Sequence, residues 1–123
     1  MPVFDPQAVI AAILALSPSV RYTALVHKNV NTTAVRTGLE NASASESDRF
    51  EELLVNPAIL LLTRNRGDLD CGGLDYLVVR YGNFFQLVMP SAEGHLSVCV
   101  ASEGDPVALA PRCREVLARY GLA

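Results

Sequence analysis

The sequence predicts a single α+β domain with the element order α-β-β-α-β-β-β-α and a five-stranded antiparallel sheet. Three observations predict it. Asp5-Pro6 and Asp105-Pro106 each combine an N-cap residue with a proline suited to the first helical position. Apolar residues alternate with a period of two from Val20 onward, as they do in a strand. Three further strand-like segments follow one another within residues 74–101.

The composition limits the classes of function. A chain of 123 residues has the length of one domain, so we expect residues 1–123 to form one unit. Half of the residues are apolar and 19% are charged, which excludes disorder and favours a self-association surface. The net charge is −3 and the ten Lys and Arg residues are scattered, so a nucleic-acid partner is not expected.

The apolar run at residues 8–16 resembles part of a secretion signal. No basic residue precedes it, Asp5 lies where positive charge is needed, and nine residues are too few to span a bilayer. The three cysteines are odd in number and lack metal-ligand spacing. We therefore expect a cytoplasmic protein with reduced thiols and no membrane insertion.

The first helix and hairpin are predicted from local signals. The helix is expected to run from Pro6 to about Ser17, where Pro18 ends it. Its core stripe consists of Val9, Ile10, Ile13 and Leu14. The strand from Val20 is expected to turn at residues 28–31 and to return over residues 32–37 as a polar edge strand.

The middle helix is expected to start near Ser45. Asp48, Glu51 and Glu52 fit its first turn as partners of the helix dipole on a solvent-exposed face. Asn56-Pro57 predicts a kink or a restart. The run AILLL at residues 58–62 is apolar all round, and its leucines favour helix over a short strand. Such a segment needs cover on two sides.

The C-terminal half is predicted as a meander of strands at residues 74–81, 84–89 and 95–101, followed by a helix. Gly82-Asn83 is expected to form a two-residue loop in which the glycine has a positive φ. Pro111 is expected to move the regular start of the last helix to about Ala110. The core face of that helix is Leu109, Cys113, Val116, Leu117 and Tyr120, and Gly121 ends it.

The passage RGDLDCGGLD at residues 66–75 has the residue types of a reactive site. As a calcium loop it offers Asp68 and Asp70, but Gly72 and Val79 occupy other ligand positions. As a phosphate cradle, its glycines precede a strand where a helix is needed. We interpret the passage as a helix-to-strand loop, with a glycine after the final helical turn.

No catalytic or metal-binding set is expected. A nucleophilic Cys71 would need a base, and the histidines are His27 and His95, both expected to be solvated next to turns. Along one strand His95 and Cys99 would be roughly 13 Å apart, too far for a Cys-His pair. Cys99 and Cys113 are expected to be small core residues. The sequence therefore predicts no catalytic, cofactor or metal residues and no enzyme.

The segment DYLVVRYGNFFQLVMPSAEGHLSVCVASEGDPVALAPRCREVLARYG, together with DPQAVIAAILALSPSVRYTALVHKNVNTTAVRTG, resembles the roadblock/dynein light chain family. The resemblance implies a roadblock-like, profilin-like sheet with the first and last helices on one face and the middle helix on the other. It also implies a non-enzymatic homodimeric adaptor, paired through its middle helices, that binds small Ras-like GTPases or joins motor complexes. Two departures are Asn29-Val30-Asn31, where the family often has Asp-Gly, and Pro57 in a helix that is usually unbroken.

The apolar residues supply an independent reason for a dimer. Burying a further face of AILLL against a second copy would contribute on the order of 10 kcal/mol before association costs. The predicted dimer interface consists of Leu53, Leu54, Ile59, Leu60, Leu61, Leu62, Tyr76 and Val78. Two alternatives stay open: a profilin-like or PAS-like sensory module that binds a small molecule, and an enzyme that uses Cys71 or the aspartates.

Overall fold

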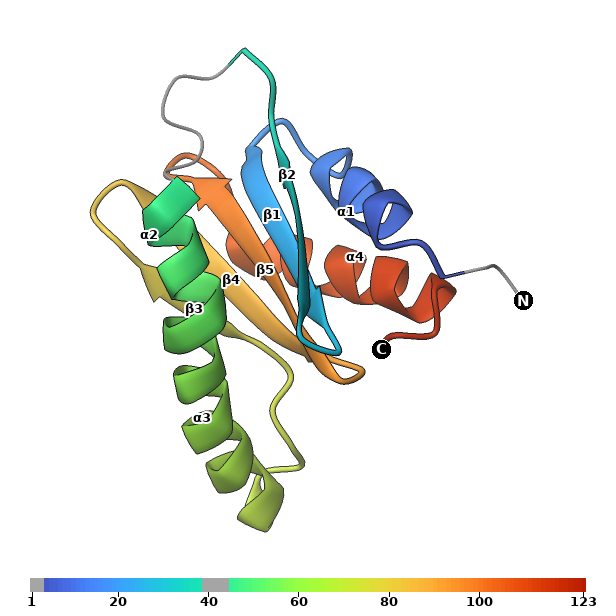
Figure 1. The fold of residues 1–123 in the computed structure, drawn as a ribbon. Helices are drawn as coiled ribbons and strands as arrows, with labels where there is room; N and C mark the ends of the chain where they lie inside the picture. The colour runs from blue at the N-terminus through green and yellow to red at the C-terminus, as the bar shows by residue number, and fades with distance from the viewer. Residues whose placement is uncertain (1–3, 39–44) are drawn as a thin grey trace.

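The computed structural model describes residues 4–38 and 45–123, which form one antiparallel sheet with helices on both faces (Figure 1). The strands are β1 (Val20–His27), β2 (Val30–Val35), β3 (Leu77–Arg80), β4 (Phe84–Ser91) and β5 (Gly94–Ala101). Their order across the sheet is β2-β1-β5-β4-β3, and every neighbouring pair is antiparallel. The predicted hairpin and meander therefore join through β1 and β5, and the predicted fold class is confirmed.

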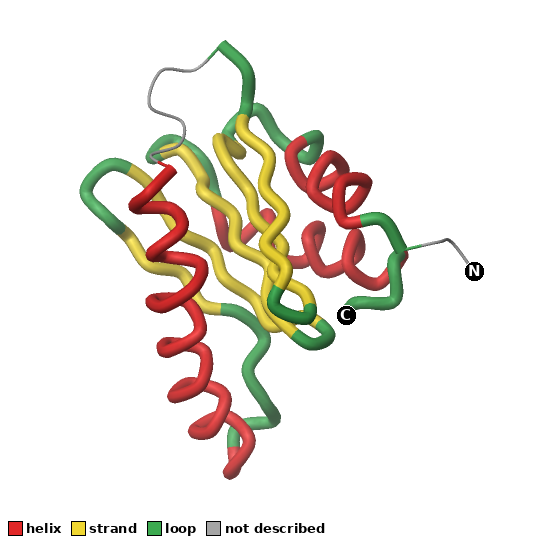
Figure 2. The backbone as a smooth tube through the Cα atoms, in the orientation of Figure 1, coloured by secondary structure: helices red, strands yellow, loops and turns green. Residues whose placement is uncertain are grey.

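Helices α1 (Pro6–Leu14) and α4 (Pro106–Arg119) cover one face of the sheet, and a long helix covers the other (Figures 1 and 2). The side facing α1 and α4 contains the main hydrophobic core. Its fully buried side chains include Ile10 and Ile13 from α1, Leu117 from α4, and Leu87 and Leu96 from the sheet. The layer under the long helix is more polar, because Gln86, His95 and Ser97 are buried there.

Both Asp-Pro helix starts are confirmed. Asp5 accepts a hydrogen bond from the Gln7 amide at 3.0 Å, and Asp105 accepts one from the Ala108 amide at 3.1 Å. The predicted end of α1 at Ser17 is wrong, since the helix stops at Leu14. The guanidinium of Arg36 donates to the carbonyls of Leu14 and Ser17, so a side chain from beyond β2 satisfies groups that further helical turns would have used.

Two expectations about turns and one about α4 are corrected. The first turn is tighter than predicted, because Lys28 and Asn29 both have positive φ and β2 begins at Val30. Gly82 does not have a positive φ. Helix α4 runs unbroken through Pro111, which lies on its exposed side, where water can solvate the carbonyl that loses its partner.

Candidate interaction surface on the long helix

The long helix consists of three consecutive segments, α2 (Ser45–Phe50), η1 (Glu51–Val55) and α3 (Asn56–Asp70). Segment η1 is a π-helix, and the Asn56 amide bonds the Glu51 carbonyl five residues earlier. The regular α-helix thus restarts at Asn56, as predicted, after an irregular segment that precedes the proline. The proline ring displaces the usual hydrogen bond there. The prediction of a helix over residues 58–62 is confirmed.

The π segment adjusts which side chains face the sheet. A π turn holds more residues than an α turn, so the chain rotates less per residue through η1. Glu52, Asn56 and Leu60 consequently share one side at intervals of four and are all buried. On the opposite side, exposed positions recur at the same interval of four residues. The pairs at residues 53–54, 57–58 and 61–62 are therefore exposed.

The buried side of this helix is attached to the sheet by polar groups. Glu52 is 1% exposed, and its Oε1 lies 2.8 Å from Nε2 of His95 on β5, which is 3% exposed. Asn56 donates to the same Glu52 oxygen at 3.0 Å. The expectation that Glu52 lies on a solvent-exposed face and that His95 is solvated is wrong. Glu52 and His95 are 43 residues apart in the chain, and no local signal pairs them.

Glu51 lies at the margin of this helix. The hydroxyl of Tyr81, which follows β3, donates to its Oε1 at 3.0 Å. Burial raises the pKa of the Glu51 carboxyl, the Tyr81 hydrogen bond opposes that change, and repulsion from Glu52 and Asp48 adds to it. Three carboxylates thus crowd this part of the helix, and a nearby positive charge would stabilise them.

The outward side of the helix is an apolar stripe, which we define as Phe50, Leu53, Leu54, Leu61, Leu62 and Leu69. All six side chains are exposed, including Leu62 at 70% and Leu69 at 79%. Figures 1 and 2 show α3 projecting beyond the end of the sheet. Six large exposed apolar residues on one helix are a feature of the kind that marks interaction sites.

The structure divides the eight residues expected at a dimer interface. Leu53, Leu54, Leu61 and Leu62 lie in the stripe, and Ile59 is half-buried beside it. Leu60 is 5% exposed and faces inward, while Tyr76 and Val78 pack against the core on the α1 and α4 side. Sequence reasoning missed Phe50 and Leu69, although extending the helical spacing in both directions would have found them.

Half of the passage at residues 66–75 is helix, and the other half is loop. Helix α3 continues to Asp70, so Gly67 lies inside it and the loop begins later than predicted, at Cys71. Gly67 permits a close approach there, because the amide of Gly73 bonds its carbonyl at 3.1 Å and an added Cβ would lie 3.0 Å from the Gly73 backbone. Gly72 and Gly73 then turn the chain with positive φ. Arg66 pairs with Asp70 along the helix.

The cysteines do not form a reactive centre. Cys71 is exposed, and its hydrogen bond to Asp70 raises the pKa of the thiol. Burial raises the pKa of Cys99 and of Cys113 to about 12 in each case, so both remain thiols at neutral pH. Among the described residues, no three His, Cys, Asp or Glu side chains are placed to hold a metal ion.

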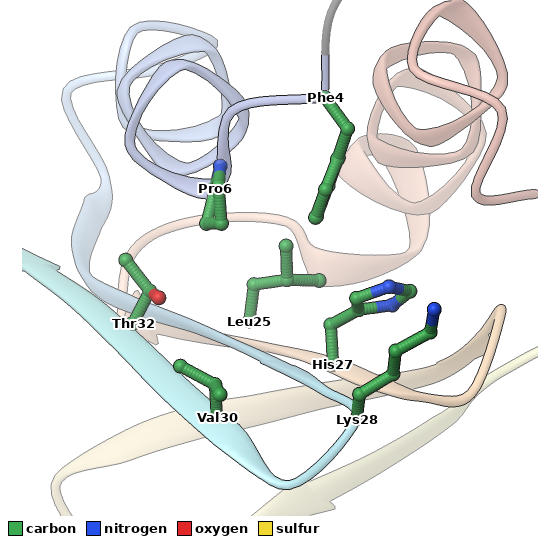
Figure 3. A pocket seen from close by; sticks show the side chains of 7 residues that line it. All are labelled: Phe4, Pro6, Leu25, His27, Lys28, Val30 and Thr32. Atoms are coloured by element: carbon green, nitrogen blue, oxygen red, sulfur yellow. The ribbon is translucent and has the colours of Figure 1, made fainter.

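A small apolar pocket of about 210 Å³ lies between the start of α1 and the β1–β2 hairpin (Figure 3). It is lined by Phe4, Pro6, Leu25, His27, Lys28, Val30 and Thr32. His27 is half-buried here, with Nδ1 at 2.8 Å from the Ala92 carbonyl oxygen and its ring 4.8 Å from that of Phe4. The pocket is smaller than the roughly 300–1,000 Å³ of typical ligand sites, and it provides no support for a small-molecule sensor.

No family model matches the sequence, and no curated protein does. Solved structures do match. The Roadblock/LC7 domain from Streptomyces avermitilis aligns with a TM-score of 0.70 and 16% identity over 94% of each chain. The gliding protein MglB from Thermus thermophilus aligns with a TM-score of 0.69 and 15% identity, over 98% of this chain and 93% of that one.

The chain has the roadblock/LC7 fold. A further match with this fold, MglB in a tetrameric arrangement, has a TM-score of 0.69 and 14% identity over 98% of this chain and 93% of the other. The resemblance seen in the sequence is thus confirmed at the level of the fold. None of the helices in the described ranges 4–38 and 45–123 is long and apolar enough to cross a bilayer.

Proposed function

We propose that this roadblock-fold chain is a non-enzymatic, cytoplasmic homodimer that regulates or scaffolds a small Ras-like GTPase. The observation that carries the proposal is the apolar stripe on the long helix, which no other part of the described chain covers. A second copy is the occupant that a roadblock fold implies, since the family resemblance pairs middle helices. One structural match is itself described as having a tetrameric arrangement, and another as a gliding protein.

The dimer is tested by mass in solution. The wild-type chain is expected to be a dimer at micromolar concentration, and the double variant Leu54→Glu/Leu62→Glu a folded monomer, because two carboxylates per chain would be buried without partners. Val107→Glu is the matched control, since Val107 is 59% exposed on α4, across the sheet from the stripe. A wild-type monomer at these concentrations would contradict the proposal.

The GTPase partner is tested separately. Small Ras-like GTPases from the same genome are mixed one at a time with the wild-type dimer, and complex formation and GTP hydrolysis are measured. A scaffold is expected to give a complex without a change in rate, and an activator is expected to accelerate hydrolysis. A stable dimer that binds none of these GTPases would refute the partner assignment and leave the dimer intact.

A further inference from the structure

Strand β2 is an edge of the sheet, and no strand within residues 4–38 and 45–123 pairs with its outer side. A two-residue loop joins His27 to Val30, and in such hairpins the pair that flanks the loop is hydrogen-bonded. The Arg36 amide bonds the Arg21 carbonyl at 2.9 Å on the same ladder. Bonded positions alternate along an antiparallel pair. The residues whose backbone N–H and C=O groups point away from β1 are therefore Asn31, Thr33 and Val35.

The sequence of β2 lacks the features that usually protect an exposed edge. Edge strands of natural proteins contain proline, charged side chains or a bulge, and these prevent other chains from pairing with them. The six residues of β2 are VNTTAV, without proline, glycine or charge, and their register with β1 is continuous. Val30 and Val35 are 61% and 41% exposed. Strand β2 is therefore suited to pairing with a further strand.

The apolar pocket lies beside this edge (Figure 3). Val30 and Thr32 line it from β2, and Phe4 and Pro6 line it from the start of α1. In an added strand, the residues opposite Val30 and Thr32 would have their side chains on the same face of the sheet as these two. The pocket volume of about 210 Å³ suits one apolar side chain of such a strand better than a separate ligand.

Positive charge flanks both ends of β2. Residues 28–36 contain Lys28 and Arg36 and no acidic residue. Lys28 lies 3.6 Å from Glu93, but the two side chains are 64% and 62% exposed, so this ion pair contributes little. Arg36 donates to three backbone carbonyls and forms no ion pair with a carboxylate of the described chain. A second copy paired through β2 would bring four cations together, whereas an acidic segment would neutralise both.

We propose that the β2 edge binds an extended segment of another protein, which adds a sixth strand to the sheet, places an apolar side chain in the pocket and has carboxylates opposite Lys28 and Arg36. At about 3.3 Å per residue, these two cations are about 26 Å apart along the strand. The complementary carboxylates are therefore separated by the same number of residues, with apolar residues at alternate positions between them. The β2 edge contains no residue of the apolar stripe, so this site does not depend on the homodimer of the proposed function.

A synthetic peptide tests the backbone pairing. The peptide has nine residues and blocked ends, with glutamate at both ends, valine at the third, fifth and seventh positions, and threonine elsewhere. Its affinity for the wild-type chain is measured by calorimetry. Thr33→Pro removes an outward N–H without breaking a bond to β1, so this variant is expected to fold and to bind the peptide about tenfold more weakly. Thr33→Val is the matched control, because it keeps the N–H, and it should bind as the wild type does.

Two altered peptides test the charges and the pocket. A peptide with lysine in place of both glutamates is expected to bind about tenfold more weakly at low salt, because it repels Lys28 and Arg36. A peptide with serine in place of the three valines is also expected to bind about tenfold more weakly, because the pocket then receives no apolar side chain. Equal affinity for the lysine and glutamate peptides would contradict the acidic partner, and equal affinity for the serine peptide would contradict the role of the pocket.

Hydrogen exchange distinguishes strand addition from other modes of binding. The amides of Thr33 and Val35 are expected to exchange rapidly in the free chain and at least about tenfold more slowly with the glutamate peptide bound. Unprotected amides in the complex, or equal binding by Thr33→Pro and Thr33→Val, would overturn the proposal. So would the absence of binding at about 1 mM peptide.

The outcomes separate this inference from the proposed function. Leu54→Glu/Leu62→Glu is expected to bind the glutamate peptide as the wild type does, so loss of the homodimer leaves the β2 site intact. A wild-type dimer that Thr33→Pro dissociates would assign the edge to a second copy and would overturn the proposal.

Discussion

Glu52 is a buried carboxylate on the side of the long helix that faces the sheet. Its Oε1 binds His95 and Asn56, and its Oε2 has no hydrogen-bond partner among the described groups. A buried carboxylate costs several kcal/mol in desolvation, so its partners have to be retained for the folded state to remain stable. The residue therefore fixes the rotation of the helix, because any other side facing the sheet would leave the buried His95 without this partner.

Replacing Glu52 with alanine is expected to lower the free energy of unfolding by about 3–5 kcal/mol, because His95 and the amide of Asn56 lose their buried acceptor. Asp75→Ala is the matched control. Asp75 pairs with Arg114 at 3.1 Å in a largely exposed site, so its loss should cost less than about 1 kcal/mol. Urea unfolding at fixed protein concentration measures both. Equal losses for the two variants would show that the buried pair does not hold the helix.

The thiols give a prediction about pH. Cys99 and Cys113 have their pKa raised to about 12 by burial, whereas a thiol in an unfolded chain titrates near about 8.5. The unfolded state therefore releases these protons first, and stability should fall as pH rises from about 8.5 towards 12. Urea midpoints measured between pH 7 and 10 check this. A Cys113→Ala variant should have a shallower decline, and an unchanged slope would contradict the assignment.

Native labelling with iodoacetamide provides a second test of the thiols. Cys71 is exposed and is expected to react, while Cys99 and Cys113 are expected to stay unlabelled until urea is added. Mass spectrometry of peptides distinguishes the three sites. Rapid labelling of Cys113 in the folded protein would mean that α4 opens from the sheet.

At the scale of single elements, helix boundaries could be predicted where the signal is local, as for the end of α4 before Gly121, and not where it depends on distant residues. Asp5 and Asp105 cap their helices through their own neighbouring amides, so a short stretch of sequence suffices to predict the starts. The end of α1 depends on Arg36, which contacts carbonyls 19 and 22 residues away. The end of α3 depends on Gly67 and Gly73 coming together, which local residue preferences do not encode.

The difference between local signals and distant contacts also explains which residues of the candidate surface could be predicted from the sequence. Four leucines of the stripe could be predicted because helical periodicity is a local property. The burial of Glu52 could not, because its partner lies on β5, and the acidic residues look like ordinary first-turn charges. The inward position of Leu60 follows from the π segment, which shifts the phase of the helix in a way that residue preferences do not indicate.

The pairing of β1 with β5, which joins the hairpin to the meander, predicts that Gly94 cannot be replaced without a loss of stability. A Cβ on Gly94 would lie 1.7 Å from the Val26 carbonyl oxygen, so Gly94→Ala must push the two strands apart. A loss of about 2–3 kcal/mol is expected from such overpacking. Gly82→Ala is the control, since nothing lies within 4 Å of its added Cβ, and it should change stability by less than about 0.5 kcal/mol. Thermal unfolding compares the variants, and equal midpoints would contradict the close approach.

At the scale of the whole molecule, the two faces of the sheet are covered in different ways. The face under α1 and α4 is closed by a continuous apolar core within one chain. The long helix on the other face is attached through Glu52 and His95 and presents its leucines outward. A single chain thus contains its own core but leaves one apolar surface for association, and the stability of the proposed homodimer should include the free energy of that association.

This arrangement predicts that the unfolding midpoint depends on protein concentration. If folded chains are dimers and unfolded chains are monomers, mass action raises the midpoint as concentration increases. The urea midpoint of the wild-type chain should therefore be higher at about 100 μM protein than at about 1 μM. The hundredfold change in concentration corresponds to about 2.7 kcal/mol of unfolding free energy per dimer, which is RT ln 100. Leu54→Glu/Leu62→Glu should remove the dependence and Val107→Glu should preserve it. A wild-type midpoint that does not move over this range would mean that the leucines remain uncovered, and the proposed pairing of the long helices would then be wrong.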